Sequence, residues 1–161
     1  MSFRAKLLSL DRLPAWREGV RAAGRRLVGT NGCFDLLHLG HVTYLEAARG
    51  LGDLLLVGVN GDSSVRALKG AGRPLNSEQD RALVLAALES VDAVCIFPQV
   101  DALGFLHAAR PDIYAKGGDY TLETINQDER RFVEGYGGRV AVLAGVAGRS
   151  TTSLVSRIAA D

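Results

Sequence analysis

The sequence has little cysteine, no long apolar run and almost no net charge, and each of these absences excludes a class of protein. Cys33 and Cys95 are the only two cysteines, so a disulfide framework is excluded and we expect both thiols to be reduced. No stretch approaches the roughly 20 apolar residues of a membrane span. Residues 1–24 also lack the apolar core of a signal peptide. A net charge of +1 gives no electrostatic support for binding nucleic acid or a membrane surface. We therefore expect a cytoplasmic protein that binds neither.

Three well-known catalytic and nucleotide-binding motifs are also missing. The sequence contains no GxxxxGK[ST], no GxGxxG and no GxSxG. These absences exclude a P-loop, a dinucleotide-binding fingerprint and the nucleophile elbow of a hydrolase. Any phosphate binding would have to come from helix N-termini and basic loops.

Apolar runs that alternate with helical patterns indicate an α/β fold. We expect strands at residues 25–30, 53–60, 91–97, 111–116 and 139–144. Between and around them, helical spacing predicts helices at residues 11–24, 38–52, 62–70, 77–90, 101–110, 128–138 and 148–160. This alternation predicts a doubly wound, five-stranded parallel sheet with helices on both faces. We expect one domain over residues 1–161, with a helical lead-in at 1–24 and the core at 25–161.

The loops at the carboxyl ends of the strands are the candidate binding segments, because ligands bind there in open parallel sheets. The first such loop, TNGCFDLLHLGH, holds His38 and His41 around Gly40, where a strand turns into a helix. Two imidazoles at a helix N-terminus suit a phosphate, with Gly40 allowing it a close approach to the backbone. Two alternatives remain open: the histidines only cap the turn, or they bind zinc together with Cys33.

Three further loops carry polar or basic residues. After the second strand, Lys69 and Arg73 lie in a glycine-containing segment. Two interpretations stay open for it: a loop that closes over a polyphosphate, or an ordinary solvated loop. For Arg81 the two interpretations are that it reaches the same site or that it pairs with Asp80 or Glu78. After the fourth strand, KGGDY forms either a site or an ordinary turn. After the fifth strand, GRSTT begins a helix, where its hydroxyls cradle a phosphate or act as an N-cap.

These segments together resemble the cytidylyltransferase-like nucleotidyltransferases. His38-Leu39-Gly40-His41 matches their HxGH signature, and GRSTT matches their C-terminal phosphate-binding signature. NGCFDLLHxGH, VGVNxDxSV, LKGxxRP, KGGDY and STT follow in that order, over roughly residues 25–158. Within the superfamily the chain is most similar to the stand-alone heptose 1-phosphate adenylyltransferases. The resemblance implies a Rossmann-like fold.

The resemblance also implies roles for individual residues. Catalysis is assigned to the histidine pair and the loop lysine: His38, His41 and Lys69. Nucleotide binding is assigned to residues of four loops: Thr30, Asn31, Gly32, Phe34, Gly40, Lys116, Gly117, Asp119, Ser150, Thr151 and Thr152. Substrate binding is assigned to Asp35, Arg73 and Arg81.

The activity implied is transfer of AMP from ATP to D-glycero-β-D-manno-heptose 1-phosphate, which gives ADP-heptose and pyrophosphate. Mg²⁺ would accompany the ATP phosphates, with no metal ligand assigned among the side chains. Family members suggest a homodimer or higher homo-oligomer. Two alternatives stay open: a cytidylyltransferase for glycerol 3-phosphate or a similar polyol phosphate, and a non-catalytic nucleotide sensor.

Overall fold

A single parallel sheet forms the centre of the molecule. The structure is a computed structural model that describes residues 2–160. The strands are β1 (Leu7–Leu8), β2 (Leu27–Gly32), β3 (Leu54–Asn60), β4 (Ala93–Phe97), β5 (Ile113–Lys116) and β6 (Arg139–Val142). They lie in the order β1-β4-β3-β2-β5-β6, and every pairing is parallel. The expected α/β fold with a parallel sheet is therefore confirmed.

The expected number of strands was wrong, because the sheet within residues 2–160 has six strands and not five. The additional strand, β1, has only two residues and pairs at the edge, with Leu7 opposite Val94 and Leu8 opposite Cys95. Two half-buried leucines are too short a segment to show a periodic pattern. The Lys6 ammonium helps to fix this edge by donating hydrogen bonds to the carbonyl oxygens of Leu88 (3.1 Å) and Val91 (2.6 Å).

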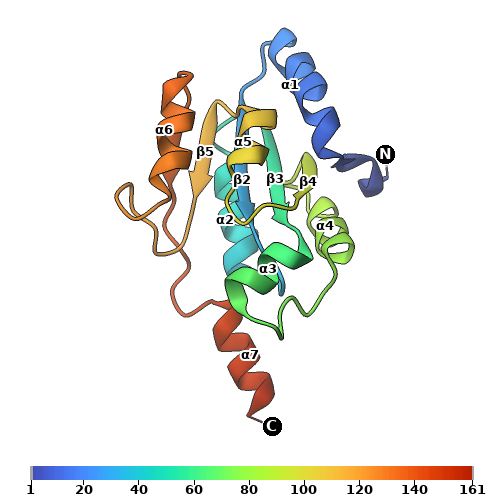
Figure 1. Ribbon diagram of the computed structural model, residues 1–161, viewed down its shortest axis with the longest axis vertical. Coiled ribbons are helices and arrows are strands. Elements are labelled where there is room, and N and C mark those ends of the chain that lie inside the picture. Colours follow the sequence, from blue (N-terminus) through green and yellow to red (C-terminus); the bar gives the residue numbers. More distant parts are fainter. Residues whose placement is uncertain (1, 161) are drawn as a thin grey trace.

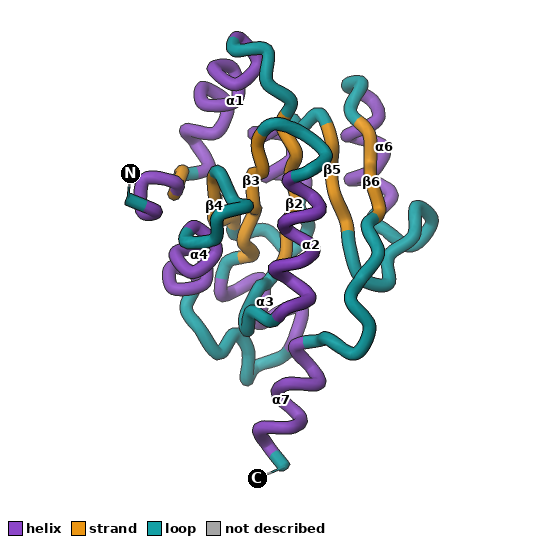
Figure 2. Tube along the Cα trace, turned by 180° about the vertical axis from the view of Figure 1, so that it is seen from behind, coloured by secondary structure: helices purple, strands orange, loops and turns teal. Residues whose placement is uncertain are grey.

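Helices cover both faces of the sheet (Figures 1 and 2). The α-helices are α1 (Leu13–Ala22), α2 (Leu39–Arg49), α3 (Asp62–Lys69), α4 (Glu78–Ala86), α5 (Leu103–Ala109), α6 (Gln127–Gly135) and α7 (Thr151–Ala159). Short 3₁₀ turns, η1 (Phe3–Lys6) and η2 (Leu10–Arg12), flank β1. None of the helices within residues 2–160 combines the length and apolar character that a membrane crossing requires.

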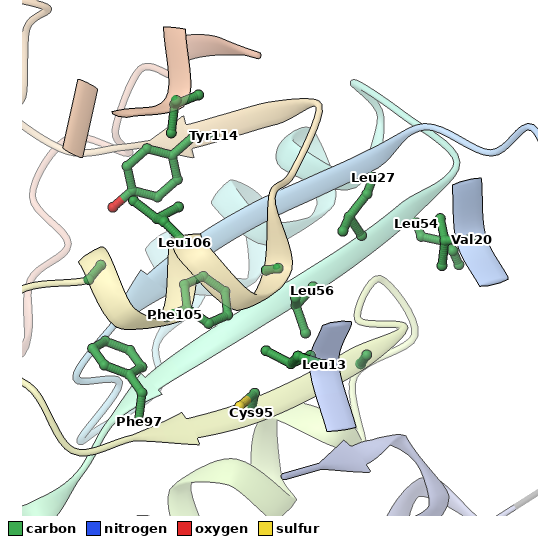
Figure 3. Close-up of a cluster of buried hydrophobic side chains, with 14 residues drawn as sticks. Leu13, Val20, Leu27, Leu54, Leu56, Cys95, Phe97, Phe105, Leu106 and Tyr114 are labelled. Atoms are coloured by element: carbon green, nitrogen blue, oxygen red, sulfur yellow. The ribbon is translucent and has the colours of Figure 1, made fainter. Parts of the chain in front are cut away.

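Alternating residues of the buried strands feed two separate cores. In β3, Leu54 and Leu56 point to a cluster with side chains from α1, α5 and α6, which Figure 3 shows. Leu55 and Val57 point to the opposite cluster, with side chains from α2 and α4. This alternation follows from the two-residue period of a strand and explains why residues 54–59 of β3 are all apolar.

The strand order creates a switch point beside β2. From β2 the chain builds outward through β3 and β4, and then returns to place β5 on the other side of β2. Connections on the two sides of such a point diverge, which leaves room for a ligand at the carboxyl ends of the strands. The segments after β2 and β5 hold the HxGH and KGGDY sequences.

Candidate active site

The two histidines stack on each other at the start of α2. Their ring centroids lie 3.9 Å apart, and the ring planes differ by 28°. His38 occupies the N-cap position of α2, but its side chain makes no capping hydrogen bond. The His38 side chain therefore does not cap the turn, as one of the alternatives had it.

Both imidazoles are partly buried. Their Nδ1 atoms are buried and have no hydrogen-bond partner among residues 2–160. Burial, together with the neighbouring His38, lowers the pKa of His41 to about 4. Burial, together with Arg149, also lowers the pKa of His38. Both rings are thus neutral at pH 7, and each neutral ring has one N–H to donate.

Glycine residues make room for the aromatic rings around the histidines. A Cβ atom at Gly40 would lie 2.9 Å from the His38 ring and 3.2 Å from Cβ of Arg149. A Cβ atom at Gly32 would lie 2.9 Å from the Phe34 ring, which contacts His41 edge-on at a centroid distance of 5.4 Å. The sequence led us to expect that Gly40 admits a phosphate to the backbone. In the structure the His38 ring fills the space beside it.

The zinc alternative has no ligand set in the part of the chain that the structure describes. His107 lies on α5, where its ring packs on Phe132 at a centroid distance of 3.9 Å. Residues 2–160 contain no group of three or more His, Cys, Asp or Glu side chains that could hold a metal ion.

Asp35 anchors the loop that follows α3. The carboxylate is 4% exposed and accepts hydrogen bonds from Arg73 Nε at 2.7 Å and from the backbone N–H groups of Leu75 (2.8 Å) and Asn76 (3.0 Å). Burial raises the pKa of Asp35, but the donors outweigh burial and hold that pKa below its usual value. Lys69, at the end of α3, is exposed just before this loop. Asp35 and Arg73 thus fix the shape of the basic segment.

Arg81 is buried, which its position in an amphipathic helix did not reveal. It is 2% exposed and donates to the carbonyl oxygens of Cys33 (2.6 Å) and Asn76 (3.0 Å). Its ion pair is with Asp62 at 2.8 Å, not with Asp80 or Glu78. It therefore joins α4 to the loops after β2 and α3, and any effect on substrate would pass through those loops.

Tyr44 of α2 contacts the carboxyl ends of both β2 and β5, through a hydrogen bond to Thr30 and through packing against Gly117. Thr30 is 1% exposed, and its hydroxyl lies 2.7 Å from the hydroxyl of Tyr44 on α2. Burial raises the pKa of Tyr44 to about 12. The ring of Tyr44 packs against Gly117, where a Cβ atom would lie 2.5 Å away. Glycine at position 117 is thus required by close packing.

A second polar cluster lies at the switch point itself. The hydroxyl of Tyr114 lies 2.6 Å from Oδ1 of Asn31 and 2.9 Å from Oε2 of Glu129. The Lys116 ammonium donates to Asn31 Oδ1 at 3.2 Å and to the Tyr114 hydroxyl at 3.3 Å. Asn31 and Lys116 were expected at the site from the sequence, whereas Tyr114 and Glu129 were not. Asp119 is exposed in the loop after β5.

The serine and threonines begin α7 next to the histidines. Ser150 is the N-cap of α7, and its Oγ accepts a hydrogen bond from Ser153 N at 3.0 Å. Thr151 donates to the carbonyl oxygen of Leu36 at 3.4 Å, while Thr152 is exposed. The expected N-cap is therefore present. Figures 1 and 2 show α7 leading away from the sheet, with its first turn near the start of α2.

The two helix starts enclose a small basic cavity. Its volume is about 90 Å³, and it is lined by the start of α2, by the residues that precede α7 and by one side of α7 itself: His38, Leu39, Gly148, Arg149, Ser150, Ser153, Leu154 and Arg157. A larger cavity of about 300 Å³ lies beside Arg26 and Asp112, which precede β2 and β5, and so lies at the opposite end of the strands. Free N–H groups and the helix dipole at a helix N-terminus favour anions. The smaller cavity combines two such termini with two arginines and a histidine.

Comparison with known proteins decides the family. The family described as cytidylyltransferase-like matches residues 30–145 of the chain. The chain belongs to this family. Proteins named bifunctional protein HldE, from Methylobacillus flagellatus and Geobacter sulfurreducens, are 52% and 49% identical to it over 154 residues. Each alignment covers 96% of this chain and 31% of the relative, so the chain spans about a third of those proteins.

Solved structures agree with the family. A lipopolysaccharide core biosynthesis protein from Thermoplasma volcanium has a TM-score of 0.63 and 30% identity, over 76% of this chain and 98% of that chain. A pantoate–β-alanine ligase from Francisella tularensis has a TM-score of 0.64 at 13% identity, over 91% of this chain and 68% of that chain. The second likeness concerns the fold alone. The resemblance that the motifs indicated is confirmed.

For a cytidylyltransferase-like protein, the arrangement around α2 and α7 suits an extended anion. Two neutral imidazoles, Arg149, Arg157 and two helix N-termini meet within one region. No carboxylate lines this small cavity. The site can therefore neutralise the charge of a polyphosphate over several positions, which is the main task in phosphoryl and nucleotidyl transfer.

Proposed function

We propose that the chain is an adenylyltransferase that transfers AMP from ATP to a sugar 1-phosphate, most specifically D-glycero-β-D-manno-heptose 1-phosphate, with release of pyrophosphate. We further propose that residues 1–161 act as one nucleotidyltransferase domain, in the cytoplasm, as a homodimer or higher homo-oligomer. ATP and the sugar phosphate are the small-molecule partners. The relatives named HldE and the lipopolysaccharide core protein support this choice of sugar.

One observation carries the chemical part of the proposal. The stacked pair His38 and His41 has buried Nδ1 atoms that find no partner among residues 2–160, and it lies where the N-termini of α2 and α7 converge. A buried polar atom without a partner costs free energy in the unliganded protein. A ligand with many hydrogen-bond acceptors removes that cost when it binds. A triphosphate is such a ligand.

The proposed reaction needs no general base. A phosphate oxygen of the sugar phosphate attacks the α-phosphorus of ATP, and the bond from that phosphorus to the bridging oxygen breaks, which releases pyrophosphate. A phosphate monoester has its second pKa near 6, so the nucleophile is largely a dianion at neutral pH. Catalysis then consists of holding the reactants in line and stabilising the negative charge of the transition state.

Each predicted catalytic residue has a task in this mechanism. We propose that His38 and His41 donate hydrogen bonds to oxygens on the α-phosphorus. Lys69, exposed at the end of α3, would reach the phosphates from the basic loop. Ser150, Thr151 and Thr152 would hold the β- and γ-phosphates at the start of α7.

We propose that Mg²⁺ accompanies ATP and neutralises charge on its phosphates. Magnesium sites in nucleotide-using enzymes rely on substrate phosphates and water, with one or two protein carboxylates at most. Residues 2–160 contain no group of three or more His, Cys, Asp or Glu side chains that could hold a metal ion. No particular residue is therefore assigned as a ligand of Mg²⁺.

The experiment that tests the proposal is pyrophosphate release with ATP or CTP, each combined with heptose 1-phosphate or glycerol 3-phosphate. The proposal predicts release with ATP and heptose 1-phosphate. Release only with CTP and glycerol 3-phosphate would establish the alternative cytidylyltransferase. Nucleotide binding without release from any pair would establish the sensor. The same assay can be applied to His41→Ala, a variant of a proposed catalytic histidine. His107→Ala removes an imidazole from the surface of α5 and serves as the control for that variant.

A further inference from the structure

We propose that Glu129 and Tyr114 are positioning residues, which hold the Lys116 ammonium at the switch point of the sheet so that one of its N–H bonds faces the nucleotide. The inference rests on the proposed function, and it extends that function to two residues outside the family motifs. It starts from a hydrogen-bonded cluster that joins four separate elements.

The cluster connects β2, β5, α5 and α6. Asn31 comes from the end of β2, and Tyr114 and Lys116 come from β5, its neighbour across the switch point. Glu129 comes from the first turn of α6, and its Oε1 accepts a hydrogen bond from Ala102 N at 2.8 Å, at the start of α5. Each carboxylate oxygen thus has a neighbour within hydrogen-bond distance, Ala102 N at Oε1 and the Tyr114 hydroxyl at Oε2.

The hydrogen bonds within this cluster use some, but not all, of the N–H bonds of Lys116. The Tyr114 hydroxyl has one hydrogen and donates it to Asn31 or Glu129, which both lie within reach. The Lys116 ammonium has three N–H bonds. Two of them have partners among residues 2–160, namely Asn31 Oδ1 and the Tyr114 hydroxyl. The third is left for an acceptor on a ligand at the carboxyl ends of β2 and β5.

The negative charge of Glu129 favours the protonated form of this ammonium. Glu129 is 5% exposed and Tyr114 is fully buried, so the pair operates away from bulk water. Burial lowers the pKa of Lys116, and the negative charge of Glu129 opposes that effect. The aromatic rings of Tyr114 and Tyr120 also face the ammonium, at 5.3 Å and 5.0 Å from Nζ. Of these three neighbours of Lys116, Glu129 is the one with a carboxylate side chain.

The local sequence explains how Glu129 reaches this position. Asn126 is the N-cap of α6, and its side chain accepts hydrogen bonds from Asp128 N (2.9 Å) and Glu129 N (3.3 Å). This cap fixes the first turn of the helix and sets the direction of the residue three positions later. The carboxylate therefore points from α6 toward β5.

The test compares Glu129→Gln with Glu134→Gln, using calorimetric titration of ATP. Glutamine keeps the size of the side chain and an oxygen for Ala102 N, but removes the charge. Glu134 lies on the same helix, is half exposed and pairs with Arg130, so it is the matched control. We expect Glu129→Gln to weaken ATP binding about tenfold at pH 8, a loss in the range of one charge-assisted hydrogen bond. The control should bind ATP as the wild type does.

Two further measurements separate positioning from a merely structural role. The pH at which ATP affinity declines on the alkaline side should move down in Glu129→Gln, because Lys116 loses its proton more easily. In a Lys116→Met background, Glu129→Gln should cause no additional loss, because it acts through Lys116. Tyr114→Phe should weaken ATP binding in the same way, and it carries the test if Glu129→Gln does not fold.

Unchanged ATP affinity in folded Glu129→Gln would overturn the inference and leave the proposed function intact. A full additional loss in the Lys116→Met background would overturn it as well. Failure of the wild-type protein to bind either ATP or CTP would overturn the proposed function and this inference together.

Discussion

The protonation of His41 gives the sharpest physical prediction. Burial and the adjacent His38 lower the pKa of His41 from 6.5 to about 4 in the folded protein. The unfolded chain takes up the proton near the ordinary pKa, so between these values the unfolded state binds more protons than the folded state. The contribution of His41 to the free energy of unfolding is therefore complete above the pKa of the unfolded chain. That contribution is lost as the pH falls toward the pKa of the folded protein.

The size of this effect follows from the two pKa values. Between pH 7 and about pH 4.5, linkage predicts that His41 lowers the free energy of unfolding by about 2 kcal/mol. His41→Gln removes this contribution and retains a polar side chain. The wild type should therefore lose about 2 kcal/mol more than the variant over that pH interval. Comparing the two proteins cancels the contributions of carboxylates that they share.

The assay is urea denaturation of wild type and His41→Gln at both pH values, with His107→Gln as the control for loss of an imidazole from the surface. Titration of the His41 ring by NMR measures the same pKa directly. Equal losses of stability in wild type and His41→Gln would refute the reasoning. An NMR pKa near 6.5 would do the same, because the site would then hold a solvated imidazole. Addition of ATP should raise the pKa of His41, since a nearby polyanion favours the charged ring.

Three further variants test individual contacts. His41→Ala should lower kcat by at least about 10²–10³ while circular dichroism shows an intact fold, since one preorganised donor is lost; turnover near the wild-type value would contradict its assigned role. Asp35→Asn should speed protease cleavage in the loop 70–76 about tenfold, because the charge that accepts the loop's N–H groups is gone; an unchanged cleavage rate would show that other contacts hold the loop. Gly117→Ala should lower the free energy of unfolding by about 1–3 kcal/mol, because its Cβ would overlap the Tyr44 ring; urea denaturation measures this, and wild-type stability would show that the ring moves aside at no cost.

Much of the fold could be predicted from the sequence because its elements are long and strongly patterned. Residues 54–59 of β3 form a continuous apolar run in a strand that is buried throughout, and α4 begins at a serine cap, as expected. β1 could not be found in this way, since Leu7 and Leu8 form a strand only by pairing with β4, more than 80 residues away.

The candidate site shows a similar division. The histidines and the STT segment could be selected because each belongs to a motif at a strand-to-helix junction. Tyr114 and Glu129 could not, since a tyrosine within a strand and a glutamate in a helix carry no local signal of their contact. Arg81 was expected to reach the phosphate site or to pair with Asp80 or Glu78, but it pairs with Asp62 and donates to the backbone carbonyl of Cys33, far away in the sequence. Periodicity predicts which face a residue occupies, but not which distant group it meets.

The central claim is that the α-phosphorus of ATP is the atom attacked, and positional labelling tests it most directly. The protein is incubated with heptose 1-phosphate and ATP labelled with ³²P at either the α- or the γ-phosphate. The account predicts that the α label enters the nucleotide sugar and the γ label leaves as pyrophosphate. Transfer of the γ label to the sugar phosphate would contradict it, because the chain would then act as a kinase.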